Sequence, residues 1–206
     1  MRGRLRIYAG LIIVVFALSA CGQTKFPDVV EQDTIVVNDD GSITSYLVRD
    51  FDKDYYELSE LTVMAREEAS EYNKQNGADS VTARAVELME DGNPRVRVVY
   101  DYTSYIHYNG INEGNIFYGT VAEAFSELPG TELDGALDFS NVTGIKNSDA
   151  ADTDKLADRH VIITDEKLMI YCPQSAVYLS EGAVSGEDGG IDATQAEGYV
   201  IIILKK

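Results

Sequence analysis

Short apolar runs on either side of turn residues restrict the fold of this chain more than any other feature. The run 34–38 is β-branched and apolar, the run 42–48 follows it, and Asp40-Gly41 lies between them. An Asp-Gly pair between two such runs is a strong signal for a β-hairpin, because its residues tolerate the positive φ angles of a tight turn. Turn residues separate two later pairs of runs, so we predict further hairpins from 80–89 with 95–102 and from 159–164 with 167–172.

The segment 58–72 has the spacing of an amphipathic helix. Its apolar residues recur at intervals of three or four, which places them on one face: Leu58, Leu61, Ala65, Ala69 and Tyr72. The helix should end near Asn76, because Gly77 can adopt the left-handed conformation of a C-cap.

The remaining segments are read from caps and apolar runs. Thr120 and Glu123 form a capping box, which predicts a short helix that ends at Pro129-Gly130. The segment 105–115 is compatible with one helical turn, and the polar segment 131–158 matches no element. Acidic, glycine-rich residues 181–197 are expected to form a mobile loop. Further strands are expected at 115–119, 176–179 and 199–204, the last at the centre of a sheet because it is almost continuously apolar.

Hairpins that carry one long and one short helix predict an α+β fold with a mainly antiparallel sheet. The chain length suits a single domain over residues 34–206, and a sub-boundary within 130–158 is left open.

The N-terminus has the pattern of a secretion signal. Three arginines precede the apolar run 7–17, which is shorter than the ~20 residues that a membrane-spanning helix needs. The motif Leu18-Ser19-Ala20-Cys21 follows and resembles the lipobox of bacterial lipoproteins. That resemblance implies a signal peptide over 1–20, a lipid on the Cys21 sulfur, and attachment to the extracytoplasmic face of the cell membrane.

Residues 21–33 then comprise the lipidated cysteine and a tether, whose residues 22–33 would reach ~40 Å when extended. Residues 46–61 and 117–125 are similar to stretches in small uncharacterised lipoproteins of Gram-positive bacteria. This second resemblance implies no activity.

The net charge of the chain limits the kinds of partner that it is expected to bind. The 206 residues carry a net charge of −18, and removal of Arg2, Arg4 and Arg6 with the signal would take it to −21. Phosphate backbones repel such a chain, so nucleic acid is not expected as a partner. Anionic lipid headgroups repel it too, which leaves the lipid on Cys21 as the means of membrane attachment.

Three carboxylates have the spacing of a calcium-binding loop. Asp50, Asp52 and Asp54 alternate with other residues, as in the first half of an EF-hand loop. An EF-hand would continue with glycine and end on a bidentate glutamate, where this chain has Tyr55 and Leu61. We therefore expect an acidic loop without a tight metal site, and no cofactor.

Tyrosine is abundant, with 13 residues against no tryptophan. Tyr100, Tyr102, Tyr105 and Tyr108 crowd one segment. They could form a stacking platform for sugar rings or a protein-binding surface, since tyrosine is a rigid amphipathic anchor. The interpretation that we favour places the rings in the core and the hydroxyl groups at its rim.

No catalytic motif is present. The sequence lacks a GxSxG elbow, an SxxK pair, an HExxH helix and a P-loop, and Cys172 is expected to be a small core residue. We expect a non-catalytic binding or envelope-associated module, whose partner is a protein or an envelope polymer. The alternative is an extracytoplasmic hydrolase with a carboxylate acid/base pair, since such a pair leaves no sequence motif.

Overall fold

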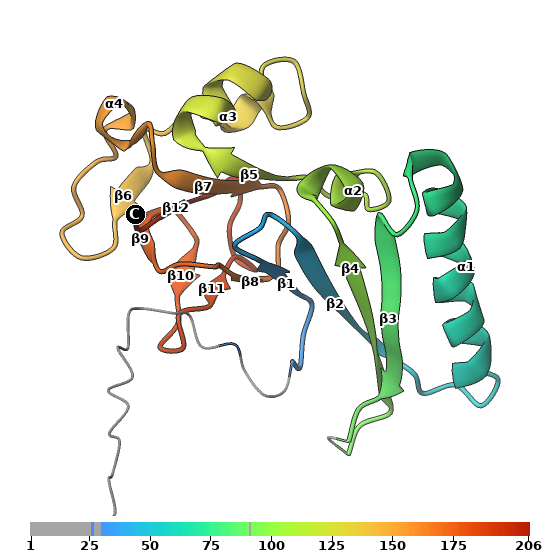
Figure 1. Ribbon diagram of the computed structural model, residues 1–206. Coiled ribbons are helices and arrows are strands. Elements are labelled where there is room, and N and C mark those ends of the chain that lie inside the picture. The colour runs from blue at the N-terminus through green and yellow to red at the C-terminus, as the bar shows by residue number, and fades with distance from the viewer. Residues whose placement is uncertain (1–25, 27–29, 91) are drawn as a thin grey trace, which may run out of the picture.

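The computed structural model describes Phe26, residues 30–90 and residues 92–206 (Figure 1). Its elements are, in chain order, β1 Thr34–Val37, β2 Ile43–Asp50, α1 Leu58–Asn76, β3 Val81–Leu88, β4 Arg95–Tyr102, α2 Tyr105–Asn109, β5 Ile116–Thr120, α3 Val121–Glu127, a 3-10 turn Asp134–Leu137, β6 Val142–Gly144, α4 Thr153–Leu156, β7 His160–Thr164, β8 Met169–Tyr171, β9 Ala176–Ser180, β10 Val184–Ser185, β11 Ile191–Asp192 and β12 Val200–Leu204.

The predicted α+β class is confirmed, but the strands form two sheets. The first sheet has the order β10-β11-β8-β1-β2-β4-β3, and all of its pairs are antiparallel except β1 with β8. The second sheet is antiparallel, with the order β5-β7-β12-β9-β6. The central position expected for β12 is therefore confirmed.

The first two predicted hairpins are confirmed. β1 pairs with β2 around the turn that contains Gly41, whose φ of 80° explains the need for glycine there. β3 pairs with β4 along its whole length, with a bulge between Ala83 and Ala85. A bulge strengthens the local twist of a strand.

The third predicted hairpin is wrong. β7 lies in the second sheet, whereas β8 lies in the first sheet, between β1 and β11. The link between them turns away at Asp165, whose carboxylate accepts hydrogen bonds from the backbone and side-chain amides of Asn115 at 2.7 and 3.1 Å. Both strands are largely buried. β7 lies between β5 and β12, whereas β8 lies between β1 and β11.

The mobile loop expected over 181–197 is also wrong. This segment contains β10 and β11, which extend the first sheet, and it buries Ile191, Ala193 and Ala196. Those three apolar residues are few among the acidic and glycine residues around them, so their contribution to the core was missed.

Both predicted helices are confirmed. α1 ends at Asn76, and the backbone amide of the following Gly77 donates to the carbonyl of Asn73. α3 opens with the capping box, in which the Thr120 hydroxyl accepts from the backbone of Glu123 and the Glu123 carboxylate accepts from the backbone of Thr120. The expected helical turn in 105–115 is α2.

The second sheet lies between two apolar cores. Ile202 belongs to the core that the two sheets share with α1 and α2, whereas Ile201 and Ile203 pack toward α3. β12 is therefore buried on both faces, which explains its continuous apolar sequence. Residues 131–158, which matched no element, supply Leu133, Phe139 and other apolar side chains to the second core.

The described part of the expected tether packs against the domain. The Phe26 ring lies 5.4 Å from the Tyr46 ring and 5.1 Å from the Tyr171 ring, measured between centroids. Val30 is buried, and its carbonyl accepts a hydrogen bond from Arg97. Two apolar side chains thus hold this segment on the first sheet, so Phe26 and residues 30–33 do not extend the reach of the chain.

Candidate functional site

A groove between α1 and the strand β3 is the best candidate for a functional site. β3 is the last strand of the first sheet, and α1 runs beside it (Figure 1). Ala65 and Ala69 are buried on the strand side of α1, and their small side chains allow close packing. The groove has a volume of about 600 Å³ and is lined by Arg66, Ala69, Ser70, Asn73 and Lys74 of α1 and by Ala78, Asp79, Val81, Thr82 and Ala83.

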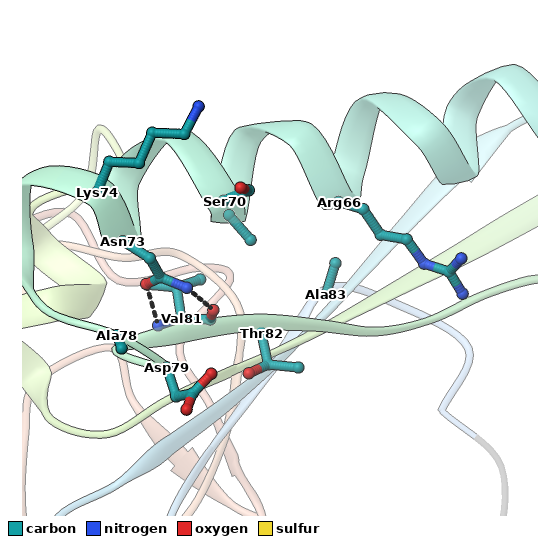
Figure 2. A pocket seen from close by; sticks show the side chains of 10 residues that line it. Arg66, Ser70, Asn73, Lys74, Ala78, Asp79, Val81, Thr82 and Ala83 are labelled. Carbon is teal, nitrogen blue, oxygen red and sulfur yellow. Dashed lines mark hydrogen bonds between the residues drawn. The ribbon is translucent and has the colours of Figure 1, made fainter.

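Asn73 closes one end of this groove (Figure 2). Its amide nitrogen donates to the Val81 carbonyl at 2.8 Å, and its amide oxygen accepts from the Val81 backbone nitrogen at 2.9 Å. The side chain therefore bonds both polar groups of Val81, as a neighbouring strand would. The two bonds fix the end of α1 against the start of β3.

The basic and acidic residues of α1 that line its two neighbouring hollows lie on opposite flanks of the helix. Arg66 and Lys74 line the groove beside β3, whereas Glu68 and Glu71 line the hollow on the other flank, next to α2. Arg66 points down from α1 toward β3, and Lys74 points away from the strand (Figure 2). Neither cation forms an ion pair with another described residue. In a chain with 35 acidic and 17 basic residues, the groove thus carries positive charge that no described carboxylate pairs.

Asp79 is the one acidic side chain among the described residues that line the groove. It lies on the far side of the strand from α1 (Figure 2). Its backbone has a φ of 62°, in the left-handed region of the tight turn between α1 and β3. The position of Asp79 leaves the α1 side of the described groove free of carboxylates.

The tyrosines highlighted by the sequence belong to the core. Tyr100, Tyr102 and Tyr108 are buried, with exposed fractions of 6%, 2% and 3%. The rings of Tyr102 and Tyr108 meet edge to face, with centroids 5.1 Å apart. Tyr105 is half-buried and packs on Phe117. The core interpretation is therefore confirmed for the three buried rings, which are not free to stack on a ligand.

The hydroxyl groups of these tyrosines reach polar partners at the edge of the core. Burial is the main cause of the raised pKa of all four phenols, and the partner carboxylates add to it for three of them. The network keeps these hydroxyl groups protonated and satisfied. Its bonds run from Tyr100 to Glu68 at 2.6 Å, from Tyr105 to Glu127 at 3.2 Å, from Tyr108 to Glu166 at 2.6 Å, and between Tyr102 and Ser45 at 3.3 Å.

Glu166 is the most strongly buried carboxyl group of this network. Burial raises its pKa, and the charges of Asp165 and Asp33 raise it further, while the Tyr108 hydrogen bond acts in the opposite direction. The carboxyl lies against Gly114, and a side chain at that glycine would require the carboxyl to move. Glu166 is thus half-buried against Tyr108 and Gly114, in the link between β7 and β8. Sequence reasoning missed this residue, because a lone glutamate after a strand has no distinguishing pattern.

The three candidate calcium ligands are all exposed. Asp50 ends β2, opposite Arg95 of β4, and Asp52 forms an ion pair with Lys53 at 3.0 Å. Within the described residues, no group of three or more His, Cys, Asp and Glu side chains is arranged to hold a metal ion. The expectation of weak calcium binding remains a prediction.

Cys172 is buried, and burial alone raises the pKa of its thiol to about 12. A thiol with this pKa is protonated at neutral pH and is a poor nucleophile. The two histidines have different partners. His107 approaches the Tyr72 hydroxyl at 3.3 Å, and His160 stacks on the Tyr118 ring.

Cys21 and the apolar run 7–17 lie outside the described residues. None of the helices in the part of the chain that the structure describes is both long and apolar enough to cross a membrane. Comparison with protein families, with curated proteins and with solved structures finds no match to this chain. The groove and the expected signal sequence are therefore the two features that bear on its function.

Proposed function

We propose that this chain is a lipid-anchored, non-catalytic binding module on the extracytoplasmic face of a bacterial membrane. The observation that carries the binding role is the edge of β3, which no described strand pairs, beside the cationic flank of α1. A groove bounded by a helix and a strand edge can accept a protein segment, whereas no catalytic motif occurs in the sequence.

The anchor is supported by the lipobox at Cys21. Phe26 is packed against Tyr46 and Tyr171, so the four residues 22–25 would join the lipidated cysteine to the domain. At roughly 3.4 Å per step, the five steps from Cys21 to Phe26 would span at most about 17 Å. The domain would therefore stay close to the membrane surface, where its partners are envelope proteins or envelope polymers.

Metabolic labelling with a clickable fatty acid tests the anchor. The wild-type chain should incorporate the label and remain in the membrane fraction. Cys21→Ala should incorporate none and lose its membrane attachment. Equal labelling of the two chains, or full membrane retention of the unlabelled variant, would show that the protein is not anchored through Cys21.

Capture from detergent-solubilised membranes tests the binding role. The wild-type chain should retain a defined partner that Arg66→Glu loses, because the substitution reverses the charge of the groove. Lys146→Glu is the matched control, since Lys146 is exposed and lies in the segment between β6 and α4. Hydrolytic turnover of cell-wall or peptide substrates by a clean preparation would contradict the proposal.

The alternative proposal is an extracytoplasmic hydrolase, and Glu166 is the observation in its favour. Its raised pKa is typical of a general acid, and Asp165 is adjacent in sequence. Both carboxylates, however, are engaged within the domain, Glu166 with Tyr108 and Asp165 with Asn115. A hydrolase would lose its activity in Glu166→Gln and keep it in Glu127→Gln, a change at the exposed partner of Tyr105.

A further inference from the structure

The outer edge of β3 has hydrogen-bonding groups that no described residue uses. In an antiparallel pair, successive residues bond alternately to the partner strand and to the other side. The Met89 backbone nitrogen donates to the Arg95 carbonyl, so Met89 bonds toward β4 and Leu88 and Val86 present their backbone groups to the free edge. At the other end of the strand, Val81 faces the same edge, but Asn73 occupies it. The free edge therefore runs beyond the bulge, over residues 85–88.

The wall opposite this edge is the flank of α1 that carries Arg66. The contact between Asn73 and Val81 aligns the helix with the strand. Arg66 lies about 10 Å from Asn73 along the helix, a distance that corresponds to about three residues of β3 beyond Val81. Figure 2 agrees with this estimate, because the Arg66 side chain extends beyond Ala83. Val63 lies about 15 Å from Asn73 along the helix, level with residues 85–86.

The apolar side chains beside the free edge are more exposed than a core position would be. Val63 and Leu88 each have an exposed fraction of 53%, although the neighbouring Val86 packs against the core. An added strand would cover both of them. Apolar side chains left open beside an unpaired strand are a feature of sheet edges that accept another chain.

We propose that the edge of β3 accepts an extended, acidic segment of a partner protein as an additional antiparallel strand. This inference rests on the proposed binding role of the groove, and it extends the bound segment along β3 beyond Ala83, the last strand residue that lines the groove. Antiparallel pairing continues the arrangement of β2, β4 and β3, and it is slightly more stable per residue than parallel pairing. Positive charge at Arg66, which no described carboxylate pairs, selects an acidic segment.

The geometry also orders the residues of the incoming strand. Side chains two residues apart point to the same face of a strand. A strand antiparallel to β3 passes Leu88 first and reaches the level of Arg66 later, so its apolar residue precedes its acidic one. The recognised pattern is an apolar residue, any residue, and then aspartate or glutamate. The apolar side chain contacts Val63 and Leu88, and the carboxylate pairs with Arg66.

The test uses a labelled octapeptide, Ser-Thr-Val-Thr-Glu-Thr-Ser-Ser with blocked ends, and fluorescence anisotropy with the full chain in detergent. A second peptide has lysine in place of glutamate. We expect the glutamate peptide to bind at least tenfold more tightly than the lysine peptide, and we expect Arg66→Glu to reverse this preference. Lys146→Glu should leave the preference unchanged. Equal binding of the two peptides, or the absence of binding at millimolar concentration, would overturn the proposal.

A pair of variants at Leu88 tests whether the backbone of β3 forms the bonds. Leu88→Pro removes the outward amide without removing a bond to β4, whereas Leu88→Ala shortens the same side chain and keeps the amide. We expect the proline variant to bind at least tenfold more weakly than the alanine variant. Equal affinity of these variants, each with the circular dichroism spectrum of the wild type, would show that no strand is added.

Two further measurements distinguish a partner strand from a second copy of the chain, and the groove from the anchor. Sedimentation of the peptide-free chain should show a monomer, because a dimer abolished by Leu88→Pro would make a second copy the occupant of the edge. The fatty acid labelling at Cys21 is independent of the groove. Loss of labelling with intact peptide binding refutes the anchor, and loss of peptide binding with intact labelling refutes the occupant of the groove.

Discussion

Replacement of Asn73 by alanine should open the closed end of the groove and lower the stability of the domain by a predictable amount. The substitution removes both hydrogen bonds to Val81 and leaves its backbone nitrogen and carbonyl without their partner. Each such bond contributes about 1 kcal/mol, so the loss is about 2 kcal/mol. Alanine favours a helix over asparagine by up to about 0.7 kcal/mol, which leaves a net destabilisation of about 1.5 kcal/mol. For a domain of this size the melting temperature should fall by about 3–6 °C.

Asn76→Ala is the matched control for this substitution. Asn76 lies in the same helix, and its amide donates one exposed hydrogen bond, to the Tyr72 carbonyl. Its replacement should change the free energy of unfolding by less than about 0.5 kcal/mol. Urea unfolding measures both variants, and hydrogen exchange should show faster exchange of the Val81 amide in Asn73→Ala alone. Equal unfolding energies for the two variants, with an unchanged exchange rate at Val81, would refute the role assigned to Asn73.

Three further outcomes follow from the buried and acidic groups. Folding raises the pKa of Glu166. The stability that this carboxyl contributes is therefore complete at pH values below its unfolded pKa near 4.5, and it is lost as the pH rises through its folded pKa. Glu166→Gln should therefore gain stability relative to wild type as the pH rises from 4 to 8, because the amide acquires no buried charge, and the Tyr108 hydrogen bond to the ionised carboxylate offsets part of this gain; a pH-independent difference in urea midpoints would be inconsistent with this reasoning. The Cys172 thiol, with its pKa of about 12, should resist iodoacetamide at pH 8 in the folded chain and react in urea, and rapid alkylation of the folded chain would contradict its burial. Titration calorimetry with calcium should give only weak heats that fall with salt, whereas micromolar affinity abolished by Asp52→Asn would establish a metal site at the start of α1.

The local elements were predictable because residues a few positions apart determine them. The Asp-Gly turn before β2, the apolar spacing of α1 and the capping box at Thr120 each act within about four residues. The continuous apolar run of β12 also indicated a central strand, because a strand with a solvated face would alternate. The tyrosine-rich segment indicated a core in the same way, through the size and apolar area of its rings.

The features that could not be predicted depend on pairing between strands that are distant in the sequence. Ile35 pairs with Ile170 in a parallel register, across 135 positions of the chain, and this contact draws β8 away from the strand that precedes it. The register of distant strands depends on how both of their faces pack, which no local pattern contains. The same contacts bring 181–197 into the first sheet, and Glu166 against Tyr108.

The groove depends on both the local sequence and the tertiary structure. The sequence by itself determined that α1 has an apolar face, that it ends just before Gly77, and that a strand follows. It also placed Arg66 and Lys74 on α1, but gave no indication of what they face. Only the tertiary structure made β3 the last strand of its sheet, since that position depends on β4 pairing with β2 on its other side. An unpaired edge is a property of the whole sheet, because it exists only where no other part of the chain supplies a partner strand.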